Sequence, residues 1–287
     1  MTMTATMLRV TARLLTLLFL AAGQAAAAAD EGPDLLEQFL GRQYEPIAKP
    51  MEIPDGTPPT EALFLYLNRG YGNAGTVREF LAEGADVNYA DQEYRNTYLH
   101  NVAYYGHAEA VRVLIAAGAQ VNAVNTEGNT PLYAAVHEGH DNITRILLAA
   151  GADVNIANIF RFTPLRQACR KSNAEMVRLL LEKGADVNFA DNRGDAPLHS
   201  AVDKGARDAA ALLMERGADI NAVGRYGDTP LHTAVSYGDD EFVKLLLSRG
   251  ADTSIRNSKG LTPLDLAEKR GFGSIVNLFK GWGKNTK

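Results

Sequence analysis

This chain of 287 residues has little cysteine, a small net charge and no long apolar run. Its single cysteine, Cys169, rules out a disulfide within the chain. The 29 Lys and Arg nearly balance the 34 Asp and Glu, so the net charge of −5 gives no reason to expect nucleic acid or an anionic membrane as partner. The apolar stretch at 14–22 is shorter than the roughly 20 residues that span a membrane.

Motifs of catalysis are missing as well. The sequence has no Gly-x-Ser-x-Gly, no P-loop, and no pair of carboxylates whose geometry the spacing defines. We therefore expect a protein that is not an enzyme.

The first 29 residues have the order of a secretory signal. Arg9 and Arg13 precede the apolar stretch, small residues fill 25–29, and Asp30 begins a polar segment. We expect residues 1–29 to be a signal peptide, with an uncleaved anchor as the alternative, and no stable membrane insertion after cleavage. The periplasm is the first expected location and secretion the second. Residues 30–59 read as a proline-rich tether with one short helix over 34–40.

Two strings repeat through the rest of the chain. Gly-Ala-Asp-Val-Asn begins at Gly84, Gly151 and Gly184, with variants at Gly118, Gly217 and Gly250. Variants of Thr-Pro-Leu-His recur at intervals of 33 residues, beginning at Thr97, Thr130, Thr163, Ala196, Thr229 and Thr262. Two motifs that share one period indicate a repeat architecture.

The repeated residues predict two helices per unit. Thr followed by Pro starts a helix, because the hydroxyl can cap it and Pro suits its first turn. A small residue three positions after each leucine of the motif allows neighbouring helices to approach closely, except that Val102 stands in the first such place. Glycines such as Gly139 and Gly238 end the helix, and paired leucines such as Leu180-Leu181 mark a second one. No unit can bury its apolar face alone, so the units must stack.

This chain resembles ankyrin-repeat proteins over roughly residues 60–280. The resemblance implies an all-α repeat solenoid, with stacked helix-turn-helix repeats linked by β-hairpin loops. We assign residues 60–284 to it, as a degenerate N-terminal cap and six repeats. It also implies that His100, His199 and His232 form hydrogen bonds between repeats, and that a protein partner binds the concave side.

Three features suggest other chemistry and have plainer interpretations. Gly70–Gly75 matches Gly-x-Gly-x-x-Gly, but it lies at the turn between two helices, and the next repeat begins before a βαβ unit could be completed. His137 and His140 stand at repeat positions that other residue types fill elsewhere, and nothing points to further metal ligands. Cys169 follows a core alanine and should be buried. We expect no cofactor, no metal and no catalytic residue.

Unusual residues at the hairpin tips and at the ends of the first helices predict where the partner binds. These positions lie three and four residues before each motif threonine (or Ala196) and seven and eight after it. Aromatic residues and Arg there are hard to explain by folding and are typical of interface hot spots. With their neighbours, the candidates are Tyr94, Tyr104, Tyr105, His137, Phe160, Arg161, Phe162, Arg170, Arg193, Tyr226 and Tyr237. They favour a partner whose surface is acidic and partly apolar.

We therefore expect an exported protein-interaction module. A scaffold or accessory partner of an envelope enzyme is the leading interpretation. An inhibitor or immunity protein that neutralises a toxic enzyme, and a secreted effector that binds a host protein, remain alternatives.

If the first 29 residues are a signal peptide, the mature protein will begin close to Asp30. N-terminal sequencing of protein recovered from the cell envelope measures this directly. A mature chain that still starts near Met1 would instead favour the anchor.

Overall fold

The computed structural model describes residues 53–54 and 56–285, with side chains as far as Trp282. The predicted signal peptide and nearly all of the predicted tether lie outside these residues. The described part folds into seven helix pairs. The first helices of the pairs are α3 (Pro59–Asn68), α5 (Tyr98–Tyr105), α7 (Pro131–Glu138), α9 (Pro164–Arg170), α11 (Pro197–Asp203), α13 (Pro230–Tyr237) and α15 (Pro263–Arg270). The second helices are α4 (Ala74–Ala82), α6 (Ala108–Ala116), α8 (Asp141–Ala149), α10 (Ala174–Glu182), α12 (Arg207–Glu215), α14 (Asp240–Ser248) and α16 (Gly273–Asn285).

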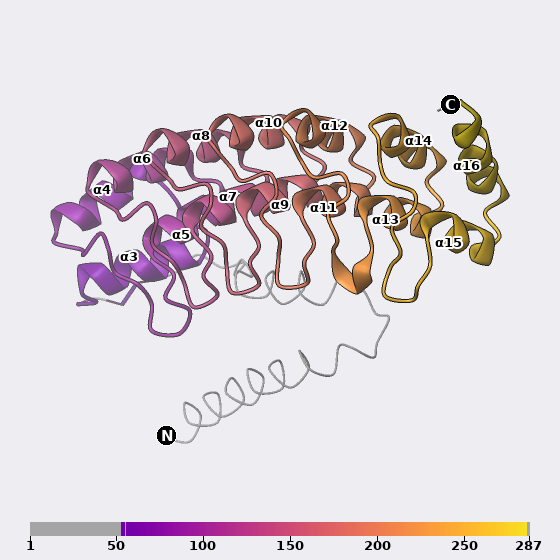
Figure 1. Ribbon diagram of the computed structural model, residues 1–287. Helices are drawn as coiled ribbons and strands as arrows, with labels where there is room; N and C mark the ends of the chain where they lie inside the picture. Colours follow the sequence, from indigo (N-terminus) through magenta and orange to yellow (C-terminus); the bar gives the residue numbers. More distant parts are fainter. Residues whose placement is uncertain (1–52, 55, 286–287) are drawn as a thin grey trace, which may run out of the picture. The chain divides into compact units, whose positions relative to one another are not determined.

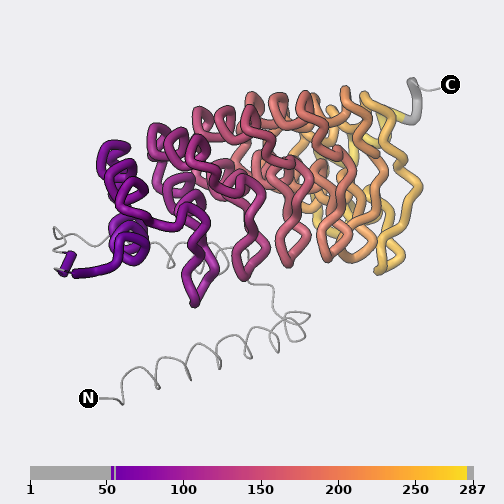
Figure 2. Tube along the Cα trace, turned by 90° about the vertical axis from the view of Figure 1, so that its left-hand side faces the viewer, coloured from indigo at the N-terminus to yellow at the C-terminus, as the bar shows by residue number. Residues whose placement is uncertain are grey.

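The helix pairs stack in two layers. The first helices form one row, the second helices form the row above it, and the connecting loops project below the first row (Figure 1). Each first helix packs against the first helix of the next pair. The loops stand side by side along one edge (Figure 2). This arrangement confirms the predicted all-α repeat solenoid.

Small side chains sit where adjacent first helices meet. The five alanines at the predicted position are at most 1% exposed, and so is the leucine that begins this face in the first five repeats. Close packing of this kind leaves no room for a larger side chain. These buried residues are Ala135, Ala168, Ala201, Ala234 and Ala267, with Leu99, Leu132, Leu165, Leu198 and Leu231.

The threonines and glycines that the sequence predicts at the helix ends cap their helices in the structure. The hydroxyl of Thr130 accepts the backbone N–H of Tyr133 at 3.1 Å, and Thr163, Thr229 and Thr262 cap their helices in the same way. Gly139 ends α7 with φ = 80°, a left-handed conformation that glycine adopts without steric cost.

The connecting loops contain less β structure than the predicted hairpins suggested. Among the described residues, one isolated antiparallel bridge joins Ala90 to Thr97, and no strand forms. Each loop is instead held by isolated backbone hydrogen bonds, as from Asn125 N–H to the Asn129 carbonyl at 3.1 Å and from Gly128 N–H to the Asn125 carbonyl at 2.9 Å. A short 3-10 turn, η1 (Arg225–Gly227), occupies one tip.

Three tips carry strained backbone, with the non-glycine residues Arg95, Arg161 and Tyr226 at positive φ. Two residues before the motif threonine, four loops have glycine at positive φ, including Gly128 at 76°. Arg95 and Arg161 occupy the equivalent place with φ of 57° and 59°. Arg161 has a structural use, because its Nε–H donates to the Ala190 carbonyl at 3.0 Å. The side chain of Arg95 is exposed and makes no hydrogen bond or ion pair within the described residues.

These two arginines make a matched pair for testing the strain. Replacing Arg95 by Gly should raise the free energy of unfolding by about 0.5–1 kcal/mol, because it relieves the left-handed strain and loses no contact. Arg161→Gly should leave that free energy unchanged or lower it, because the Ala190 bond is lost. Urea unfolding of both variants measures the difference. Equal stabilisation would mean that the Arg161 contact contributes nothing.

Candidate functional site

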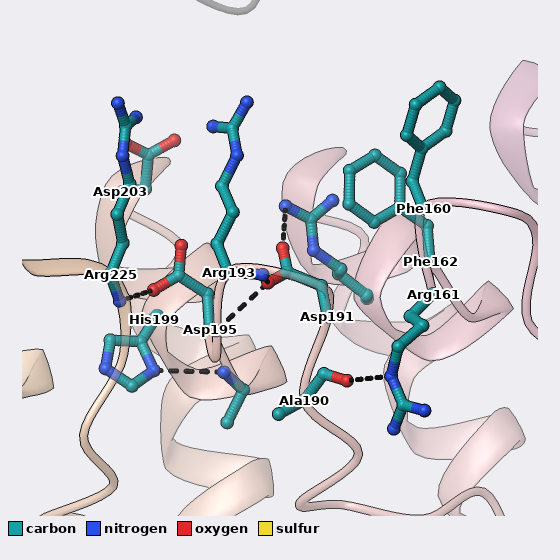
Figure 3. Close-up of polar contacts among 12 residues, drawn as sticks. Phe160, Arg161, Phe162, Ala190, Asp191, Arg193, Asp195, His199, Asp203 and Arg225 are labelled. Atoms are coloured by element: carbon teal, nitrogen blue, oxygen red, sulfur yellow. Dashed lines mark hydrogen bonds and ion pairs between the residues drawn. The ribbon is translucent and has the colours of Figure 1, made fainter. Parts of the chain in front are cut away.

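The candidate site is the surface formed by the loop tips and the ends of the first helices, which we call the loop face. It consists of the residues three and four positions before, and seven and eight positions after, each motif threonine or Ala196. Figure 3 shows that tip and helix-end residues meet here: Phe160, Arg193 and Arg225 extend in one direction, with the Asp203 carboxylate beside Arg225. Residues far apart in the sequence thus share one side of the loops.

The N-terminal part of the loop face is aromatic and half-buried. Tyr104 and Tyr105 meet edge to face at the end of α5, with ring centroids 5.3 Å apart. The Tyr105 hydroxyl donates to the Asn68 carbonyl at 3.0 Å, so this ring also ties the first helix pair to the second. Tyr94 lies on the neighbouring tip. Burial is the main cause that raises the pKa of all three phenols to about 12, so they remain neutral hydrogen-bonding groups at pH 7.

His137 is more buried than its place in the predicted site implied. Its side chain is 13% exposed and stacks on the ring of Tyr133, with centroids 6.2 Å apart. Its Nδ1 lies 2.6 Å from a carboxylate oxygen of Glu138. Burial alone would raise the pKa of Glu138, but His137, together with Lys171 and His140, lowers it. Little of the His137 ring is therefore available to a partner.

The two phenylalanines of the next tip are half-buried, although the sequence suggested that they are exposed. Their ring centroids lie 5.6 Å apart. The ring of Phe162 covers the guanidinium of Arg166, with Cζ 3.7 Å from the ring centroid. Only Phe160 extends in the direction of Arg193 (Figure 3). Phe162 thus has a structural role beneath the tip.

Arg161 does not join the loop face. It extends away from Phe160, in the opposite direction to Arg193 (Figure 3). Its guanidinium lies 4.5 Å above the ring of Phe189, and its Nε–H binds the Ala190 carbonyl. The structure therefore gives Arg161 the role of joining two loops, a role that its sequence position did not indicate.

The remaining candidates lie further along the stack. Arg193 is exposed, and its side chain makes no ion pair or hydrogen bond within the described residues. Tyr226 and Tyr237 are 53% and 62% exposed. Arg225 covers the Tyr226 ring, and the Tyr237 hydroxyl donates to the carboxylate of Asp203. Arg170 is half-buried at the end of α9.

Comparison with known families agrees with this geometry. Models of ankyrin repeats match residues 63–158 and 157–224 (three copies) and residues 213–267 (many copies). The chain belongs to the ankyrin-repeat family. No curated protein matches it. Ankyrin repeats identify the chain as a protein–protein interaction module.

The ankyrin histidines join neighbouring repeats, as the resemblance implied. His100 accepts the Thr97 N–H on Nδ1 at 3.1 Å and donates from Nε2 to the Asn129 carbonyl of the next repeat at 2.9 Å. Burial lowers the pKa of His100 to about 4, so the neutral ring that this pattern requires is the form present at pH 7. His199 and His232 repeat the arrangement, bonding to the carbonyls of Asp228 and Leu261.

The glycine string at 70–75, His140 and Cys169, for which the sequence suggested other chemistry, also have structural roles. Gly72 faces His107, whose ring would lie 1.9 Å from an added Cβ, and His107 donates to the Gly70 carbonyl at 2.6 Å. Packing against this ring accounts for Gly72, and a positive φ of 79° accounts for Gly70. His140 donates to the Tyr104 carbonyl at 2.8 Å. Cys169 is fully buried, which confirms its core position and raises the pKa of its thiol to about 12.

Residues 53–54 and 56–285 contain no cluster of three or more His, Cys, Asp or Glu that could hold a metal ion. None of their helices combines the length and the apolar character that a membrane crossing requires.

One ankyrin repeat departs from the pattern in a way that the sequence analysis missed. Arg166 replaces the motif histidine, and its Nη2 lies 3.0 Å from Oδ2 of Asp191 in the next loop. Both side chains are buried, at 8% and 0% exposure. Asp191 also accepts the backbone N–H groups of Arg193 and Asp195 (Figure 3). The signal was present, because Thr-Pro-Leu-Arg and an Asp in the usual Asn position occur 25 residues apart.

This buried pair predicts a strong coupling. Arg166→Ala should lower the free energy of unfolding by roughly 3 kcal/mol, because it leaves the Asp191 carboxylate buried without its cation. The double variant Arg166→Ala with Asp191→Asn should be more stable than Arg166→Ala alone. Urea unfolding of the two single variants and the double variant measures the coupling. Strictly additive effects would contradict it.

Proposed function

We propose that this ankyrin-repeat chain is an exported, non-enzymatic scaffold or accessory protein that binds an envelope enzyme through its loop face. The periplasm is the proposed location, on the basis of the signal-like order of residues 1–29. The proposal depends on one observation above all: Arg193 is exposed, extends in the same direction as Phe160 and Arg225, and has no side-chain partner among the described residues.

The chemistry of the loop face supports a protein partner. Half-buried tyrosines and phenylalanines offer large, rigid contact areas that lose little conformational entropy on binding. Exposed arginine adds donors that suit carboxylates. The partner should therefore offer carboxylates beside apolar pockets. Tyr226 and Tyr237, each more than half exposed, extend the aromatic surface along the stack.

The proposal is tested with tagged protein used to capture partners from envelope extract, followed by binding measurements with the captured protein. Tyr104→Ala, Phe160→Ala and Arg193→Ala should each weaken binding by about 1–3 kcal/mol, with little change in melting temperature. An enzyme that stays active in the complex supports the scaffold, whereas an inactivated enzyme would favour the inhibitor.

Two variants of the second-helix layer serve as controls. Arg145 forms an ion pair with Glu175 at 3.0 Å, and Lys183 ends α10. Arg145→Ala and Lys183→Ala should leave the affinity unchanged. If they weaken binding as much as the three loop-face variants do, the loop face is not the binding site.

A further inference from the structure

The charges of the loop face are divided between its two ends. In the repeats that begin at Thr97 and Thr130, this face carries three carboxylates and no Lys or Arg. In the last four repeats it carries eight Lys and Arg and a single carboxylate, Asp203. The acidic residues of the first part are Glu93, Glu127 and Glu138; the basic residues of the second part are Arg170, Lys171, Arg193, Lys204, Arg225, Lys259, Lys269 and Arg270.

Part of the positive charge on the loop face of the last four repeats has no ion pair within the described residues. Asp203 already contacts Lys204, at 3.5 Å, and accepts the Tyr237 hydroxyl. Among residues 53–54 and 56–285, no carboxylate forms an ion pair with Arg193 or Lys259. On the second helices, by contrast, ion pairs are frequent, as between Arg207 and Asp239 at 2.7 Å. The whole chain has a net charge of −5, so this basic strip opposes the overall sign.

We propose that the last four repeats bind an extended acidic segment of the partner that runs along the stack, from repeat to repeat. This inference rests on the proposed function and specifies its ligand. Neighbouring packed helices lie about 8–10 Å apart. A segment in the extended polyproline II conformation advances about 3.1 Å per residue with about three residues per turn, so every third side chain faces the same way and meets the next repeat. A carboxylate at every third position therefore matches the spacing of the cations.

The same division favours a protein segment over nucleic acid. A phosphate backbone carries its negative charge without interruption, so along this face it would meet Glu93, Glu127 and Glu138. A protein segment can place its carboxylates on the last four repeats and apolar side chains against Tyr94, Tyr104 and Phe160. The division of charge thus also determines the orientation of the partner, with its acidic part on the last four repeats and its apolar part on the aromatic residues.

The test uses fluorescence anisotropy with the purified protein and two labelled peptides of fifteen residues. One has Glu at every third position, and the other has the same composition with its Glu residues in one block. The spaced peptide should bind at least about 10-fold more tightly than the block, and its affinity should fall as salt is added. Equal affinities for the two peptides would overturn the extended-segment proposal. A single-stranded DNA oligonucleotide that binds more tightly than the spaced peptide would also overturn it.

A pair of charge reversals locates the site. Arg193→Glu should weaken binding of the spaced peptide at least about 10-fold. Arg249→Glu makes the same change at the exposed end of α14, and should have no such effect. A melting curve for each variant establishes that it is folded. Equal effects of the two reversals would refute the assignment to the loop face.

The outcome separates this inference from the proposed function. If envelope extract yields a partner that depends on Tyr104 and Phe160, but neither peptide binds, the scaffold proposal stands and the acidic-segment inference fails. If the spaced peptide binds through Arg193 but no captured protein depends on the loop face, the inference stands and the scaffold proposal fails.

Discussion

An asparagine side chain that reaches from one repeat to the next is the contact on which the solenoid depends. The last residue of each Gly-Ala-Asp-Val-Asn string accepts a backbone N–H of the following repeat, as Asn122 does from Asp153 at 2.9 Å. Its amide also donates back to the following repeat, as Asn155 does to the Gly184 carbonyl at 3.1 Å. A repeat that stood alone would leave these loop groups without a protein partner, as well as its apolar helix face exposed to water. The same neighbouring repeat thus both satisfies the hydrogen-bonding groups of the loop and buries the apolar helix face.

This constraint also determines which positions are free for function. Residues within the stack must be small, apolar or hydrogen-bonded across a repeat boundary, as Ala201 and His232 are. The loop tips and helix ends lie outside that requirement, so residues such as Arg193 can vary without breaking the stack. Arg161 and Tyr105 are exceptions, because the guanidinium of Arg161 joins two loops and the hydroxyl of Tyr105 joins two helix pairs. Freedom at the tips is therefore a tendency of the fold and must be checked residue by residue.

The sequence predicted the features that depend on local chemistry and on the period. The caps formed by Thr130 and the buried thiol of Cys169 follow from residue type at a repeat position, whereas the bridging ring of His100 was implied by the resemblance to ankyrin repeats. It did not predict the Arg166–Asp191 pair or the cover that Phe162 provides, because these depend on how two loops meet in space. Positive φ at Arg95 was equally hidden, since arginine gives no local signal for a left-handed backbone.

The loops that carry the loop face are also joined to one another, and this prepares them for binding. Backbone hydrogen bonds link successive tips, as from Thr126 N–H to the Tyr94 carbonyl at 2.8 Å and from Ser258 N–H to the Tyr226 carbonyl at 2.8 Å. At one junction the pattern changes, and Arg225 N–H donates instead to the side chain of Asp195 at 2.8 Å.

That junction carries Arg193 and Arg225, the two arginines that extend together in Figure 3. The bond to the Asp195 side chain holds the tip that carries Arg225 in place, and the Arg193 carbonyl takes no part in the ladder, that is, the series of backbone hydrogen bonds between successive tips. A surface fixed before the partner arrives loses less entropy on binding. Tip residues on this ladder can therefore contribute more of their contact energy to affinity than residues on unlinked loops could.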